Sequence, residues 1–517
     1  MKRRYKIALA IVGVLVAAGM SLHLPIKSPQ IVISRQTTFI DGPLNPDGTV
    51  NYAAAVDARC SEGVTPQNNA ANLLLKAFGR SCFMKPLEQS VPEQEILSRL
   101  GLTVDDIQSP GNFKPWEDRK KTAPATASAP TTGSRAGKRG NPDPGISEVL
   151  VSLQEGIIHP DLRGWLADNE QALRMVQQAS TLPKLYFPIV SSDNPPLFIT
   201  SFNVCISPFR DAPDALVCRA ALRIHDGDID GAWSDLLTMH RFARLVGQLP
   251  TLLANILAFL IDDMASEQGT AFVTRGPMPP EKALAILRQL EALPPPGDIV
   301  YTTDVYERFG VLESIMFLSR GGNTTRLGYG RMRTAGLDYD LMLRFCNASY
   351  DEHVAALRLG QFAGRKEAHA AYQRQREQLT KDIRSLKYRS VLYALGGWGT
   401  RQFASKEIAR VICMIGDHFS IISRTEEDST RLEIEKLALA LACFHARQGH
   451  WADRLEELTP ELVGTIPKDV FSDKALVYKA DQNGYLLYSV GMNERDDGGS
   501  SDDISAQVKH SSSPRDP

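Results

Sequence analysis

The end of the chain decides the fold, through LEIEKLALALACFHARQG (432–449), LVYKADQNGYLLYSV (476–490) and GMNERDDGGSSDDI (491–504). The first stretch has apolar residues at steps of three and four: Ile434, Leu437, Leu441 and Phe444. This spacing predicts a helix with one apolar face. Thr430 and Glu433 have the spacing of a capping box, so we expect the helix to begin there.

A β-hairpin is predicted after this helix. Two runs rich in β-branched and aromatic residues, 476–479 and 485–490, flank Asp481-Gln482-Asn483-Gly484, whose Asn-Gly pair favours a tight reversal. After Gly491 no apolar periodicity returns until Ile504. This acidic tail therefore either folds around a ligand or remains a solvated terminus, and both alternatives stay open.

The order of helix, turn, hairpin and acidic tail resembles the globular end of the major pseudopilin of bacterial type II secretion systems. The motifs that carry the resemblance are Gly449-His450-Trp451, Pro467-Lys468-Asp469-Val470-Phe471, Tyr478, Tyr485, and Ser489-Val490-Gly491 through Gly498-Gly499 to Asp503-Ile504. The family's tail binds calcium, a cation that takes six to eight oxygen ligands. The resemblance implies a calcium site with these ligands: Asn493, Asp502 and Asp503, with Asp496 as a substitute donor.

The chain also departs from that family. Ala452 and Val470 stand where the family has proline, and Asn493 stands where it has an aspartate ligand. The N-terminus lacks the Gly-Phe-Thr-x-x-Glu signature of a prepilin. We therefore expect a borrowed module and not a pilin subunit. The whole architecture resembles uncharacterised membrane-anchored bacterial proteins, which implies no activity.

The N-terminus predicts export. Met1-Lys2-Arg3-Arg4 precedes an apolar run over 7–24, and positive residues stay on the cytoplasmic side. We predict a single-pass signal anchor. Through this N-terminal helix the protein would be attached to the cell membrane, with its C-terminal part outside the cytoplasm. The alternative is secretion after cleavage near Val16-Ala17-Ala18.

Composition excludes several classes of function. A net charge of −2 gives no basis for nucleic-acid binding. The seven cysteines include no Cys-x-x-Cys, so a zinc site is not predicted. Cys60 and Cys82 either form a disulfide or remain buried thiols.

Composition and periodicity divide the 517 residues into six segments. These are the signal anchor (1–27), a helical and extended segment (28–117), a disordered linker (118–144), a helical domain (145–425), the pseudopilin-like α+β module (426–508) and a disordered tail (509–517). The linker carries almost no large apolar side chains. The predicted fold class is mainly α, with an irregular multi-helix domain and a small C-terminal α+β module of a helix plus a β-hairpin.

Three acidic motifs are assigned structural roles. Asp226-Gly227-Asp228-Ile229-Asp230-Gly231 fits half of an EF-hand loop, but Leu237 stands where calcium needs a glutamate, so we predict a helix cap. Asp262-Asp263 is predicted to end an apolar helix face in water. Glu426-Glu427-Asp428 is predicted to precede a helix N-terminus, where negative charge is favourable.

No catalytic constellation is visible in the sequence. His445 and His450 lack the spacing of a helical zinc pair, and His-Glu-x-x-His, P-loop and Gly-x-Ser-x-Gly motifs are absent. The leading hypothesis is a membrane-anchored, non-enzymatic protein with a helical interaction or scaffold domain, an unidentified protein partner and a calcium-binding C-terminal module. One alternative is an extracytoplasmic hydrolase whose groups converge only in three dimensions, recognisable by a His–carboxylate pair in a pocket. Another is an accessory component of a pilus-like secretion machine.

Overall fold

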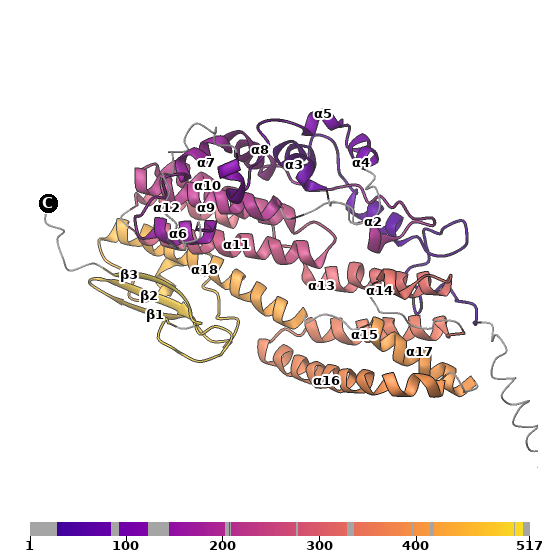
Figure 1. The fold of residues 1–517 in the computed structure, drawn as a ribbon. Helices are drawn as coiled ribbons and strands as arrows, with labels where there is room; N and C mark the ends of the chain where they lie inside the picture. The colour runs from indigo at the N-terminus through magenta and orange to yellow at the C-terminus, as the bar shows by residue number, and fades with distance from the viewer. Residues whose placement is uncertain are drawn as a thin grey trace, which may run out of the picture. The chain divides into compact units, whose positions relative to one another are not determined.

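The computed structural model describes residues 28–83, 93–121, 144–201, 206, 208–275, 278–327, 336–393, 398–413, 418–500 and 502–509. Helices dominate, and one small antiparallel sheet lies near the C-terminus (Figure 1), which confirms the predicted fold class. The chain forms two compact units. The first comprises Met1–Arg59, Ser191–Phe202 and Ile299–Ser420, and the second comprises Cys60–Val190, Asn203–Asp298 and Ile421–Pro517.

The first unit is built mainly from helices of the middle of the chain. They are α2 (Tyr52–Cys60), α13 (Ile299–Thr302), α14 (Arg308–Ser319), α15 (Tyr339–Leu357), α16 (Phe362–Tyr393) and α17 (Trp398–Ile412), with a π-helical turn at Thr303–Glu307. In its core the Phe309 ring lies 5.0 Å from the Tyr52 ring, centroid to centroid. Glu313 is also buried, and its carboxylate accepts the backbone N–H groups of Phe198 and Ile199.

The second unit contains most of the other helices. Its helices are α3 (Ala71–Phe78), α4 (Glu93–Arg99), α5 (Val104–Ile107), α6 (Ile146–Gln154), α7 (Leu162–Asp168), α8 (Glu170–Ser180), α9 (Pro208–Asp226), α10 (Ile229–Val246), α11 (Leu252–Thr274), α12 (Pro280–Glu291) and α18 (His418–Gln448). Helix α10 packs against both α9 and α11. The Asp228 carboxylate accepts the backbone N–H of Gly231 at 2.9 Å, which confirms that this acidic turn caps α10.

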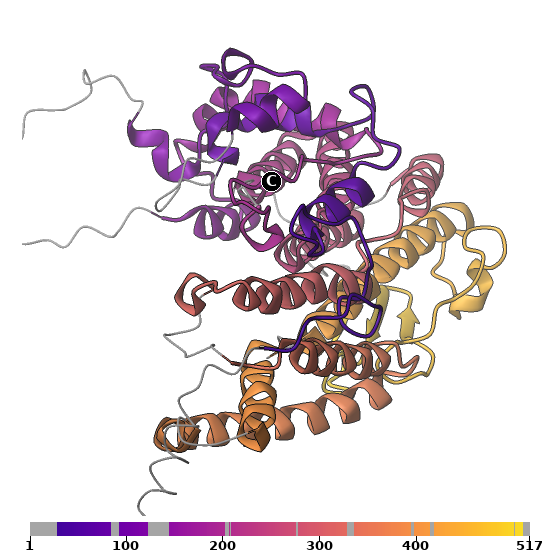
Figure 2. The same ribbon diagram turned by 90° about the vertical axis from the view of Figure 1, so that its right-hand side faces the viewer.

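The C-terminal module follows α18. After a 3₁₀ turn at Leu455–Leu458, strands β1 (Val477–Asp481), β2 (Gly484–Ser489) and β3 (Ile504–Lys509) form an antiparallel sheet in the order β1-β2-β3. The sheet lies beside α18 in both ribbon views (Figure 2), and β3 also contacts α11. The predicted hairpin is confirmed by β1 and β2, whereas β3 was not predicted.

The predicted start of the last helix is wrong. Helix α18 begins at His418, and the Thr430 hydroxyl lies within it, donating to the Glu426 carbonyl at 2.7 Å. Ile422 and Ser423 are buried, so tertiary packing extends the helix past the local capping signal. Glu426-Glu427-Asp428 therefore lies inside the helix and not ahead of it.

The described residues contain no helix of the predicted transmembrane kind. No helix in the described ranges is both long and apolar enough to cross a bilayer. Helix α11, for example, carries Asp262, Asp263 and Glu267 within its 23 residues. The segment 1–27, to which the signal anchor was assigned, lies outside the described residues, as do 122–143 of the predicted linker and 510–517 of the predicted tail.

Candidate functional site

The acidic tail folds into a loop between β2 and β3, and three carboxylates meet there. Ligand oxygens of Asp497, Asp502 and Asp503 all lie within 4.8 Å of one another. Asp503 is only 9% exposed; its Oδ2 accepts the backbone N–H groups of Asp497 (3.1 Å) and Gly499 (2.8 Å). Its Oδ1 is buried without a hydrogen-bond partner. Leaving a buried carboxylate oxygen unpaired costs free energy, and a bound cation would remove that cost.

Glycines allow the loop to close tightly. Gly491 and Gly499 have φ angles of 66° and 83°, a region that side chains other than glycine rarely adopt. A Cβ atom on Gly491 would lie 2.4 Å from the Asp502 carbonyl oxygen. The backbone therefore comes close to itself at the point where the carboxylates gather.

The structure brings together three of the four predicted ligands. The Asn493 amide donates from Nδ2 to the carboxylates of Asp502 and Asp497, the latter at 3.0 Å. Asp496 instead accepts the Tyr488 hydroxyl at 2.6 Å, and this hydrogen bond lowers the pKa of Asp496. Asp497, which the resemblance did not select, occupies the place expected for Asp496. Two neighbouring aspartates cannot be distinguished by spacing alone.

Asp469 fixes the end of β2, from which the loop departs. This carboxylate is almost fully buried; its Oδ1 accepts the Ser489 hydroxyl at 2.8 Å, and its Oδ2 accepts the Val490 N–H at 3.2 Å. It also accepts the Phe471 N–H and the Ser472 hydroxyl. The Pro467–Phe471 motif is therefore tied to the sheet through one side chain.

A second polar cluster lies inside the second unit, where α10, α11 and α18 meet. His240 Nδ1 donates to Asp262 Oδ1 at 2.7 Å, and Arg244 Nη1 donates to Asp262 Oδ2 at 2.7 Å. On the other side of the imidazole ring, Nε2 lies 3.5 Å from Glu435 Oε2. The side chains of His240 and Glu435 are both 0% exposed. We call these four residues the buried ion cluster.

Opposing effects set the charges in this cluster. Burial alone would lower the pKa of His240, but its hydrogen bond with Asp262 and the negative charges of Asp262 and Glu435 outweigh burial and raise it to about 9. Burial would raise the pKa of Asp262, but His240 and Arg244 hold it below its ordinary value. Burial raises the pKa of Glu435. At neutral pH His240 is therefore an imidazolium with Asp262 as its ionised partner.

Glu435 is held against a polar stripe of α11. Both of its carboxylate oxygens are buried without a hydrogen-bond partner, as are the hydroxyls of Ser266 and Thr270. A Cβ atom on Gly269 would lie 1.9 Å from Glu435 Oε1, so this approach requires glycine. Asp262 lies on the same helix and is 4% exposed, so the prediction that it ends an apolar face in water is wrong.

Further carboxylates connect the buried ion cluster with the acidic loop. Asp263 pairs with Arg431 across α11 and α18. Burial, followed by the charges of Asp263 and Asp262, raises the pKa of Asp428 to about 9. Burial also raises the pKa of Glu427, and Asp502 of the acidic loop contributes to that rise. The loop is therefore close enough to α18 for their charges to interact.

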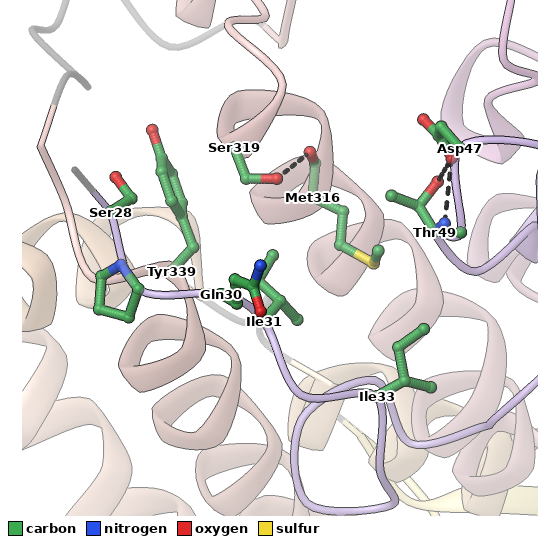
Figure 3. Close-up of a pocket in the computed structure, with 11 residues that line it drawn as sticks. Ser28, Gln30, Ile31, Ile33, Asp47, Thr49, Met316, Ser319 and Tyr339 are labelled. Carbon is green, nitrogen blue, oxygen red and sulfur yellow. Dashed lines mark hydrogen bonds between the residues drawn. The ribbon is translucent and has the colours of Figure 1, made fainter.

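A separate pocket of about 450 Å³ lies within the first unit (Figure 3). It is bordered by the extended segment 28–33, by Asp47 and Thr49, by Met316 and Ser319 of α14, and by Tyr339 of α15. Among its described lining residues Asp47 alone carries a charge, and it accepts a hydrogen bond from Thr49 and pairs with Arg320 at 3.2 Å. These residues provide no pair of groups for acid–base chemistry.

Comparison with known proteins gives no indication of the function of this chain. No protein-family model, no curated protein and no solved structure matches this chain. The resemblance to pseudopilins therefore stays a prediction from the quoted motifs. The acidic loop and the buried ion cluster are the two arrangements from which a function can be argued.

Proposed function

We propose that this chain is a calcium-binding interaction protein. Its C-terminal module binds Ca²⁺ in the loop between β2 and β3, and its helical part serves as a scaffold for a protein partner. The observation that carries the proposal is the convergence of Asp497, Asp502 and Asp503, one of which has a buried oxygen without a partner.

The spacing of the carboxylates suits calcium. Oxygens bound to one Ca²⁺ at about 2.3–2.6 Å lie at most about 5 Å apart, and the three carboxylates are within 4.8 Å of one another. Rotation of the Asn493 amide would turn its oxygen toward the same carboxylates, in place of the nitrogen that now bridges them. Calcium also tolerates irregular, flexible loops better than magnesium does.

Calcium at this position would stabilise more than the loop. The loop leads into β3, which contacts α11, and Asp502 acts on Glu427 of α18. A cation beside Asp502 would offset the repulsion between these two carboxylates. We infer that calcium strengthens the packing of the sheet on α11 and α18, so that the scaffold and the module melt together.

The hydrolase alternative required a His–carboxylate pair that a substrate can reach. His240 and Asp262 form such a pair, but both side chains are buried and His240 has no exposed surface. A substrate atom cannot contact the imidazole in this conformation. The pair therefore does not favour a hydrolase, and we propose no second function.

Thermal melting of the full chain with calcium and with chelator tests the proposal. At a concentration of about 100 times its dissociation constant, a ligand that binds only the folded state adds about 2.7 kcal/mol to the free energy of unfolding. This added stability raises the melting temperature. The double variant Asp502→Ala, Asp503→Ala should lose this rise, whereas Glu461→Gln, an exposed acidic residue of the same module, should keep it. Equal melting temperatures in millimolar calcium and in chelator would refute the proposal.

A further inference from the structure

Two buried thiols of the first unit lie where α15 packs against α17. Cys346 is in the middle of α15, and Cys413 directly follows α17. Cys346 is 0% exposed and Cys413 is 7% exposed, and both are free thiols. Buried cysteines are common, but two that meet on facing helices are a specific arrangement.

Each thiol reaches the backbone of the opposite helix. Cys346 Sγ lies 3.6 Å from the carbonyl oxygen of Ala409 in α17, and Cys413 Sγ lies 3.8 Å from the carbonyl oxygen of Cys346 itself. The backbone N–H of Cys413 donates to the same Ala409 carbonyl at 2.7 Å. Each sulfur atom therefore lies beside the backbone of the segment that carries the other cysteine.

We propose that Cys346 and Cys413 form a disulfide that joins α15 to α17. A disulfide needs side chains that approach across a short backbone separation, and packed helices with facing cysteines provide it. The pairing is independent of the calcium proposal, because it concerns the first unit alone.

The reaction is a thiol–disulfide exchange with a low-molecular-weight disulfide such as oxidised glutathione. One protein thiolate attacks a glutathione sulfur and releases one glutathione thiolate, which forms a mixed disulfide. The second protein thiolate then attacks the mixed disulfide and releases the second glutathione. Two protein thiols are oxidised, one glutathione disulfide is reduced to two thiols, and the two protons pass to the released thiolates.

Burial determines when the exchange takes place. Burial, together with the neighbouring Cys413, raises the pKa of the Cys346 thiol well above its ordinary value. In the packed state Cys346 therefore contains almost no thiolate, which is the reactive form. Exchange should be fast while the chain folds and slow once α15 and α17 have packed.

The bond would join two cysteines that are 67 positions apart in the sequence, and the loop that it closes contains α16. Cross-linking a long loop restricts the unfolded chain more than cross-linking a short one. The oxidised protein should therefore melt at a higher temperature than the reduced protein.

The test is to refold the full chain with reduced and oxidised glutathione and then to digest it without reduction. The expected result is a cross-linked pair of peptides, one with Cys346 and one with Cys413. The mass of this pair should be lower by two hydrogen atoms than the summed masses of the two reduced peptides. Alkylation of both cysteines in the chain that was refolded with oxidised glutathione would overturn the proposal. This measurement needs no variant, so it does not depend on whether a substitution folds.

Variants give a second readout. Cys413→Ser should abolish both the cross-linked peptide and the rise in melting temperature on oxidation. Cys218→Ser, which removes a buried thiol of α9 in the second unit, should leave both unchanged. A cross-linked peptide that survives in Cys413→Ser would assign the bond to other cysteines and overturn the pairing.

Discussion

His240 of α10 donates its Nδ1 proton to Asp262 of α11 at 2.7 Å, and neither side chain has appreciable contact with solvent. Arg244 holds the other oxygen of the same carboxylate. Glu435, from the helix that leads into the C-terminal module, lies against the far side of the imidazole ring. His240 thus links α10 and α11 with α18, the helix that leads into the C-terminal module.

Removing the histidine should destabilise the second unit strongly. In His240→Leu, Asp262 keeps Arg244 but Glu435 loses its only nearby positive charge among the contacts described above. Breaking a buried pair on one side costs about 3–5 kcal/mol, which urea denaturation would measure. The double variant His240→Leu, Glu435→Leu should lose less than the two single losses added together. Additive losses would show that the two side chains do not interact.

Stability should fall as the solution becomes alkaline. The folded-state pKa of His240, about 9, lies above its ordinary value of 6.5. The imidazolium therefore contributes stability that is complete below its ordinary pKa and is lost as the pH rises through about 9. From about pH 6 to about pH 10 the free energy of unfolding should decrease by about 3 kcal/mol because of this group. His240→Gln should flatten the profile, and an unchanged slope in that variant would contradict the assignment.

Gly269 and Gly164 make a matched pair of helical glycines in the second unit. In Gly269→Ala the new methyl group would lie 1.9 Å from a Glu435 oxygen, so the buried ion cluster would have to move, and we expect a loss of about 1–3 kcal/mol. In Gly164→Ala no atom lies within 4 Å of the new methyl group, and the gain in helix propensity should stabilise the protein by up to about 1 kcal/mol. Chemical denaturation of both variants would measure these changes in the free energy of unfolding. Equal effects would mean that Glu435 is not held against α11.

The choice between two neighbouring aspartates can be tested directly. Asp497→Asn should weaken calcium binding about tenfold or more, because it removes one of three charged ligands from the loop. Asp496→Asn, which changes the partner of the Tyr488 hydroxyl, should alter affinity much less. Isothermal titration with calcium measures both constants. A larger loss from Asp496→Asn would restore the ligand set that the family resemblance implies.

Asp469 should be essential to the C-terminal module whether or not calcium is bound. Asp469→Ala leaves the Ser489 hydroxyl and the Val490 N–H without their acceptor, at a cost of about 1–3 kcal/mol for each buried group. Asp473→Asn is the control, because its ion pair with Lys468 is exposed and should contribute less than about 1 kcal/mol. Thermal melting in chelator separates this effect from calcium binding. Similar melting temperatures for the two variants would rule out the anchoring role.

Local patterns in the sequence predicted the elements well where a short segment determines its own conformation. Asn483-Gly484 turns the chain between β1 and β2, as the predicted hairpin requires. Asp228 caps α10, as predicted for an acidic turn that lacks the last ligand of an EF-hand loop. These features depend on hydrogen bonds and side chains within a few residues, so they are visible without the rest of the fold.

The start of α18 and the fate of Asp262 show where such reasoning fails. The capping signal at Thr430 is genuine in sequence, but burial of Ile422 and its neighbours favours a longer helix. Asp262 looked like a solvent-facing end of an apolar stripe, yet His240 and Arg244 make its burial favourable. In both cases the deciding partner is distant in sequence, and periodicity carries no information about it.

The sequence alone was sufficient for the mainly helical class, the C-terminal hairpin and the acidic, glycine-containing tail, because helical periodicity, turn propensity and composition are local properties. Only packing brought Glu435 against His240 and put Asp497 beside Asp502 and Asp503. The physical reason is the energy of charge in a protein interior. Whether a carboxylate stays ionised, pairs or awaits a cation depends on the groups around it, and those groups come from segments that meet only when the chain is folded.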